Sequence, residues 1–114
     1  MKHSIYKEGE SRTVGDAHIV NILTSASCAQ ISIARANLQG HHGPTANLSS
    51  LRAYYILDGR ADVTIDGCTL AASKGDVIVV PTGAIHEIDG HVEYLVINTP
   101  AFNPEDERAI DRNE

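Results

Sequence analysis

The sequence is short of positive charge: its 114 residues include 9 Lys and Arg against 15 Asp and Glu, which gives a net charge of −6. A small acidic chain without a basic cluster is a poor ligand for nucleic acids and for anionic membranes, so neither is expected as a partner. The longest aliphatic run, Val77 to Val80, is far too short to cross a membrane. The first residues hold no apolar segment typical of a secretory signal, and the expected location is the cytoplasm.

Cysteine is scarce, and the motifs of several enzyme classes are missing. Cys28 and Cys68 lie far apart and form no Cys-x-x-Cys pair, which favours packing roles over redox chemistry. No G-x-S-x-G elbow accompanies the serines, and no glycine-rich phosphate loop is present. Helical periodicity is also absent from every long window. These absences argue against a serine hydrolase, a P-loop enzyme and a helical bundle.

The sequence does have regularly spaced glycines in its second half. They follow a polar residue at Asp58-Gly59, Asp66-Gly67, Lys74-Gly75, Thr82-Gly83 and Asp89-Gly90. Such pairs suit tight turns, because glycine accepts a positive φ. Strands are expected at residues 18–24, 30–36, 52–57, 63–65, 77–80 and 92–98. Short strands separated by turns indicate a β-sandwich or barrel, and a chain of this length with 42% hydrophobic residues suits one domain.

Two segments interrupt this strand pattern. Residues 39–50 are polar, with two glycines and a proline, and are expected to form a loop of the kind that carries function at a barrel mouth. In the tail, Asn103 can cap a helix and Pro104 suits its first position, so a short helical turn is expected there.

The segment GDVIVVPTGAIHEIDG resembles the second conserved motif of the cupin superfamily, G-x5-P-x-G-x2-H-x3-N. The matching residues are Gly75, Pro81, Gly83 and His86, and Gly90 stands where Asn is common. The resemblance covers about residues 30–102. It implies an all-β fold, a double-stranded β-helix (jelly-roll) barrel with a short C-terminal helical turn, formed as a single cupin domain by residues 1–114. It also implies that His86 points into the barrel, where the family commonly binds a metal.

The first cupin motif, G-x5-H-x-H-x3,4-E-x6-G, is where the sequence departs from the family. Its glutamate position holds Arg52, and its two histidine positions hold Thr45 and Asn47, or Ala46 and Leu48 at the shorter spacing. The nearby histidines, His41 and His42, are displaced, and adjacent residues of a strand point to opposite faces. A guanidinium inside the barrel would oppose a cation and favour an anion.

These considerations select the candidate site residues. Strand alternation puts Arg52, Tyr54 and Ile56 on one face, which is the interior if the cupin register holds. The catalytic candidates are His86 as general acid/base, Arg52 as oxyanion stabiliser and Tyr54. The ligand-binding candidates are Asn47, Thr45, His42 and Tyr94. The candidate metal ligands are His41, His42 and His86.

Three functions remain open. The first is a metal-independent isomerase, lyase or cyclase acting on a polar or anionic metabolite in the barrel. The second is a metal-dependent dioxygenase or lyase with iron, manganese, zinc or nickel on the candidate histidines. The third is a non-catalytic module that binds a metabolite. Apolar residues on both faces of residues 92–98 further predict a homodimer.

Overall fold

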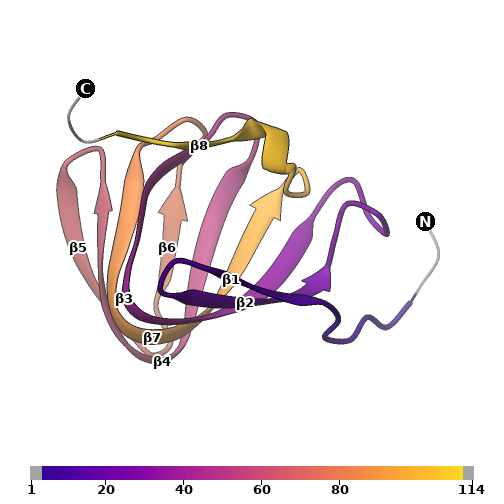
Figure 1. Cartoon of the computed structure of the whole chain (residues 1–114), viewed down its shortest axis with the longest axis horizontal. Helices are drawn as coiled ribbons and strands as arrows, with labels where there is room; N and C mark the ends of the chain where they lie inside the picture. Colours follow the sequence, from indigo (N-terminus) through magenta and orange to yellow (C-terminus); the bar gives the residue numbers. More distant parts are fainter. Residues whose placement is uncertain (1–3, 112–114) are drawn as a thin grey trace.

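The computed structural model describes residues 4–111, which form an antiparallel sheet folded over on itself (Figure 1). The strands are β1 (Ser11–Val14), β2 (Ala17–Leu23), β3 (Ser32–Asn47), β4 (Leu51–Ile65), β5 (Cys68–Ser73), β6 (Val77–Val80), β7 (His86–Thr99) and β8 (Glu107–Ala109). A 3-10 turn, η1 (Pro104–Asp106), precedes β8. The all-β barrel expected from the sequence is confirmed.

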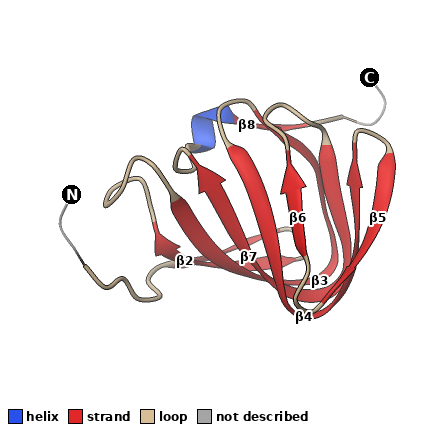
Figure 2. Cartoon of the chain, turned by 180° about the vertical axis from the view of Figure 1, so that it is seen from behind, coloured by secondary structure: helices blue, strands red, loops and turns tan. Residues whose placement is uncertain are grey.

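The sheet has eight strands in the order β1-β2-β3-β7-β4-β5, with β6 on β4 and β8 on β3. The first half of β4 pairs with β6 and its second half with β5, while β7 runs along its whole length. The long strands β3, β4 and β7 bend between their halves, at the lower end of the views in Figures 1 and 2. The two halves of the folded sheet thus face each other across the core.

Two of the five glycine pairs lie at this bend and are not turns between strands, which corrects the sequence prediction. Gly59 lies inside β4 and Gly90 inside β7, with φ of 86° and 147°. A Cβ on Gly59 would overlap the carbonyl oxygen of His91, and one on Gly90 that of Arg60. Glycine is therefore needed here because the strands approach too closely for a side chain. Asp66-Gly67, by contrast, does form the turn between β4 and β5.

Residues 39–50 were expected to be a loop, and the structure corrects this too. β3 continues to Asn47, so that only residues 48–50 connect it to β4. Residues 39–42 and Thr45 pair with β7, with a register shift between His42 and Thr45, and residues 45–47 pair with β8. Main-chain pairing with β7 and β8, which are distant in sequence, makes this segment a strand although it has no alternating apolar residues. The local sequence therefore does not predict the strand.

The tail begins as the sequence predicts. The Asn103 side chain accepts a hydrogen bond from the Glu105 amide at 3.1 Å, and η1 starts at Pro104. The following strand β8 was not expected. It pairs with the end of β3 and crosses the upper end of the folded sheet in Figure 1, where it places Glu107 opposite Asn47.

The core fills the space between the two halves of the sheet. Its buried members are Ala17, Ala36, Leu38, Tyr54, Ile56, Ala61, Val63, Ala72, Ile78, Val80, Ala84, Ile88, Val92 and Tyr94. Outside, the face made by β4 and β6 exposes large apolar side chains, with Val77 59% and Val79 53% accessible. No helix within residues 4–111 is long and apolar enough to cross a membrane.

Candidate functional site

Arg52 is at the centre of the candidate site. Alternation along β4 turns Arg52, Tyr54 and Ile56 inward, and Arg52 is only 4% exposed. Its Nε donates to Asn98 Oδ1 at 2.9 Å, and its Nη2 donates to Glu107 Oε2 at 2.9 Å. Burial opposes the charge of Arg52, but Tyr54 and Glu107 raise its pKa above the usual value. The side chain is therefore a fixed cation held between β7 and β8.

His86, at the start of β7, is bonded at both ring nitrogens. Its Nδ1 lies 2.9 Å from the Ala84 carbonyl oxygen and its Nε2 lies 3.1 Å from Arg52 Nη1. Because a carbonyl only accepts and a guanidinium only donates, Nδ1 carries the proton and Nε2 accepts. Burial and the positive charge of Arg52 lower the pKa of His86. His86 is thus a neutral imidazole that orients the guanidinium.

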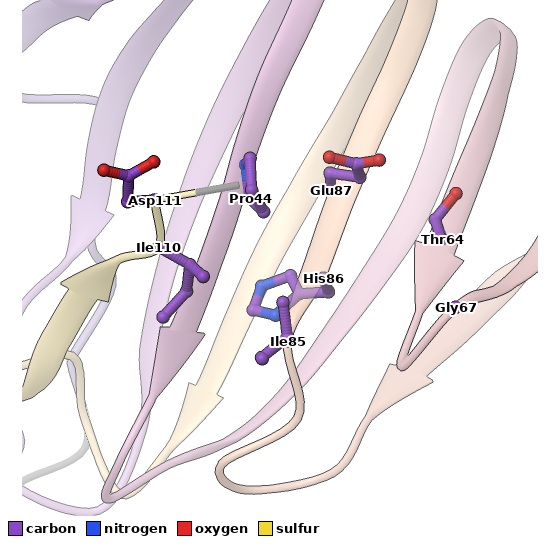
Figure 3. Close-up of a pocket in the computed structure, with 8 residues that line it drawn as sticks. All are labelled: Pro44, Thr64, Gly67, Ile85, His86, Glu87, Ile110 and Asp111. Carbon is purple, nitrogen blue, oxygen red and sulfur yellow. The ribbon is translucent and has the colours of Figure 1, made fainter. Parts of the chain in front are cut away.

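His86 also lines a smaller cavity of about 300 Å³ between the ends of β4 and β7 and the residues after β8. Figure 3 shows its ring among the side chains of that cavity, near Ile85 and Ile110. The larger cavity, described below, is not lined by His86. The structure therefore brings His86, a predicted catalytic residue, into contact with Arg52 but leaves it outside the lining of the large cavity.

His41 and His42 are adjacent in β3, and both are among the residues that line the large cavity. His41 pairs with the exposed Asp89, and its Nε2 lies 2.9 Å from the Gly43 carbonyl oxygen. His42 is opposite the buried Ile88 and lines the large cavity. Burial, reinforced by Arg52, lowers the pKa of His42, so its ring is neutral near pH 7. Within residues 4–111 the ring makes no hydrogen bond, which leaves a nitrogen lone pair for a bound molecule.

Two tyrosines form the floor beside Arg52. Tyr54 and Tyr94 meet edge to face, with ring centroids 5.2 Å apart and an interplanar angle of 82°. Burial raises the pKa of both phenols, so they are neutral hydrogen-bond donors. Tyr94 and Asn98 are both 2% exposed, which shows that their face of β7 is the inner one.

The large cavity has a volume of about 920 Å³. Its inner end is lined by His42, Thr45, Arg52, Tyr54, Tyr94 and Asn98, and its outer end by residues of β1 and β2 such as Arg12 and Asn21. This volume lies within the range of small-molecule sites. Asn47, a predicted ligand-binding residue, does not line it, because its Oδ1 accepts from the Ser49 and Ser50 amides in the β3–β4 turn.

The metal that the cupin resemblance implies does not fit these residues. His86 Nε2 faces the Arg52 guanidinium, and the ring nitrogens of His41 contact Asp89 and the Gly43 carbonyl oxygen. Among residues 4–111, no three His, Cys, Asp or Glu side chains are grouped so that they could hold an ion. The fixed charge of Arg52 at the glutamate position of the motif adds repulsion to this lack of ligands.

Sequence reasoning missed one functional neighbour, Glu107. It contacts Arg52 from β8, 55 positions later, and no motif marks it. Asn98 could have been found, since it shares the strand face of Tyr94 and pairs with Arg52 in register. The tail offered no comparable signal, because a three-residue strand has no detectable periodicity.

Comparisons with known proteins agree with this architecture. The model of the cupin domain family matches residues 40–98, slightly more than half of the chain. Among solved structures, Streptomyces PAC13 with uridine is 21% identical, with a TM-score of 0.87 over 96% of this chain and 92% of that one. Another Pac13 structure, described as that of a unique nucleoside dehydratase, is 22% identical, with a TM-score of 0.86 and the same coverage.

More distant structures share the fold with other activities. KdgF from Halomonas sp. is 12% identical, with a TM-score of 0.76 over 91% of this chain and 99% of that one. Oxalate decarboxylase from Lactobacillus farciminis, in a formate complex, is 17% identical, with a TM-score of 0.75 over 89% of this chain and 33% of that one. No curated protein matches the sequence. At these identities the likeness shows the fold, which serves many chemistries.

Proposed function

The chain belongs to the cupin domain family, and we propose that it is a metal-independent enzyme of the lyase, isomerase or cyclase type. Its substrate is a small polar or anionic metabolite that enters the large cavity. The observation that carries this proposal is a neutral His42 with no hydrogen bond inside residues 4–111, set in the same cavity as a fixed cation and two neutral phenols. A free base next to positive charge is suited to removing a proton and stabilising the anion that forms.

The proposed chemistry divides the work among three kinds of side chain. His42 removes a proton from a carbon next to a carbonyl, because a neutral imidazole is a base that works near pH 7. The positive field of Arg52 stabilises the enolate oxygen that develops, and His86 keeps the guanidinium in place. Tyr54 or Tyr94 donates a hydrogen bond to the same oxygen or to the leaving hydroxyl. Departure of that hydroxyl as water, with the proton that His42 removed, gives elimination, and return of the proton to the other face of the same carbon gives isomerisation.

The related structures favour elimination and suggest which compounds to test first. Pac13 is described as a nucleoside dehydratase, and PAC13 is seen with uridine. A nucleoside fits easily within about 920 Å³. We therefore propose nucleoside derivatives whose sugar carries a carbonyl with a hydroxyl β to it, and other polar metabolites with the same arrangement, as the first compounds to assay.

The decisive experiment is solvent exchange. Wild-type protein is incubated in D2O with each member of such a panel, and deuterium uptake and loss of water are followed by mass spectrometry. Proton abstraction by His42 predicts exchange with the wild type, and a loss of at least 100-fold with His42→Gln. The matched control is His91→Gln, an exposed histidine of β7 that does not line the large cavity and whose replacement should leave the activity unchanged. Exchange that survives His42→Gln would contradict the proposed base.

The metal-dependent alternative makes the opposite prediction. Elemental analysis of protein purified without a histidine tag should then find stoichiometric iron, manganese, zinc or nickel, and chelation should abolish activity. The metal-independent proposal predicts activity that chelation does not change. A panel that binds but never exchanges or reacts would support the non-catalytic binding module.

A further inference from the structure

The fixed charge of Arg52 suggests at first an anion-binding pocket, but β8 supplies a carboxylate to it. Glu107 Oε2 accepts from Arg52 Nη2 at 2.9 Å, and the two side chains are 25% and 5% exposed. The other carboxylate oxygen, Oε1, lies 3.4 Å from Asn47 Nδ2. One oxygen is thus bonded to the pocket cation and the other faces the end of β3. The carboxylate thus takes up one of the N–H donors through which the guanidinium could bind an anion.

The rest of the guanidinium is also bonded to the protein. Nε donates to Asn98 and Nη1 donates to His86, so each of its three nitrogens has a partner. A carboxylate or phosphate entering the cavity would have to displace Glu107 to gain a bidentate contact. It would also meet the negative charge of Glu107 itself at a few ångströms, where like charges repel each other strongly.

The position of Glu107 is fixed by the main chain around it. β8 pairs with β3 from Thr45 to Asn47, Thr45 Oγ1 donates to the Arg108 carbonyl at 2.9 Å, and the Leu48 amide donates to the Asp106 carbonyl at 2.9 Å. These bonds lie on both sides of Glu107 in sequence. The carboxylate is therefore held at Arg52 by its strand and does not reach it from a flexible tail.

We propose that Glu107 is a specificity-determining residue: as the internal counter-ion of Arg52, it makes the inner end of the cavity select uncharged polar ligands and reject anions. This inference rests on the proposed function, since it assumes that the large cavity is the ligand site, and it narrows the substrate from polar or anionic to uncharged. Arg12, at the outer end of the cavity, stays outside this pairing; its Nη1 donates to Asn21 at 3.2 Å.

The test uses inorganic phosphate as the anion probe and the histidine rings as reporters. The ring Cε1–H signals of His42 and His86 are followed by NMR during titration with sodium phosphate at pH 7, against sodium chloride of equal ionic strength. Wild-type protein should show no saturable shift, whereas Glu107→Gln should bind phosphate at least tenfold more tightly. Glu107→Ala, which also removes the bulk of the side chain, should behave in the same way.

The controls separate the pocket from the rest of the protein. Glu105→Gln removes an equal charge from the exposed side of η1 and should leave phosphate binding as in the wild type. Adding Arg52→Gln to Glu107→Gln should abolish the gained site, whereas phosphate held at Arg12 would survive that change. Wild-type binding as tight as that of Glu107→Gln, or no gain in both Glu107 variants, overturns the inference.

The outcomes also distinguish this inference from the proposed function. If no compound exchanges or reacts while Glu107→Gln gains phosphate, the enzyme proposal fails and the selectivity stands. If wild-type protein acts on a nucleoside while neither Glu107 variant gains phosphate, the enzyme proposal stands and the selectivity fails.

Discussion

Replacing Arg52 with alanine should cost the protein a large part of its stability. The guanidinium is buried and bonds to Asn98, His86 and Glu107, so truncation leaves two buried acceptors and one carboxylate without their donor. At 2.9 Å and an effective dielectric constant of ~20, the Arg52–Glu107 attraction alone is about 6 kcal/mol before desolvation is subtracted. Breaking one side of a buried ion pair typically costs about 3–5 kcal/mol.

The expected loss lies near the lower end of that range, about 3 kcal/mol. Glu107 is 25% exposed and can regain water when its partner is removed, whereas Asn98 is 2% exposed and cannot do so easily. Since small domains are stable by about 5–15 kcal/mol, the variant should still fold, with a clearly lower midpoint. Urea unfolding at pH 7, followed by circular dichroism, measures this difference.

Arg35→Ala is the matched control. Arg35 pairs with Glu8 at 2.8 Å, but on the surface, with side-chain exposures of 28% and 52%. Exposed pairs contribute little, so this variant should keep a midpoint close to that of the wild type. If Arg52→Ala loses no more stability than Arg35→Ala, the network around Arg52 does not hold the barrel end together, and the reasoning is refuted.

Three further predictions concern pH, the strand bend and association. The pKa values of His42 and His86 lie below the ordinary 6.5, so the unfolded chain binds protons at these residues that the folded chain does not. The free energy of unfolding should therefore be constant above about pH 7 and fall as the pH drops through about 6.5. The slope should be at most ~1.4 kcal/mol per pH unit for each histidine. A urea midpoint unchanged from pH 7 to 5.5 would contradict this. Gly90→Ala should destabilise the protein more than Gly75→Ala, because both glycines have a positive φ but only the Cβ at position 90 would meet backbone atoms; equal thermal midpoints would contradict the close approach of the strands at Gly90. Because β6 exposes an apolar face, light scattering should give the mass of a dimer for the wild-type protein and the mass of a monomer for Val79→Lys. A monomer mass for the wild-type protein would contradict the predicted dimer.

Sequence reasoning predicted the strands and turns correctly where a residue type favours only one kind of local structure. Pro81 and Gly83 fall between β6 and β7, as a proline that ends a strand and a glycine in a turn should. Strand alternation also predicted correctly that Arg52 and Tyr54 share the inner face. Periodicity carries this information because one face of β4 packs against the core and the other does not.

The same reasoning failed where one residue type serves two purposes. Asp58-Gly59 and Asp66-Gly67 are the same dipeptide, yet the first bends a continuous strand and the second makes a turn. What separates them is the neighbouring strand: a Cβ at Gly59 would meet the backbone of β7, and nothing lies within 4 Å of one at Gly67. Local sequence does not contain that difference.

Glu107 shows why a site can be incomplete when it is derived from motifs alone. The cupin motif position occupied by Arg52 indicated a cation in the barrel, and an anionic ligand followed from that residue taken by itself. The electrostatics of the pocket depend on the pair, because a carboxylate 2.9 Å away from the guanidinium weakens its attraction for an incoming anion and itself repels that anion. The second member comes from a three-residue strand that only main-chain pairing with β3 positions. A charge at a family position therefore predicts ligand charge only after the tertiary partners of that residue are known.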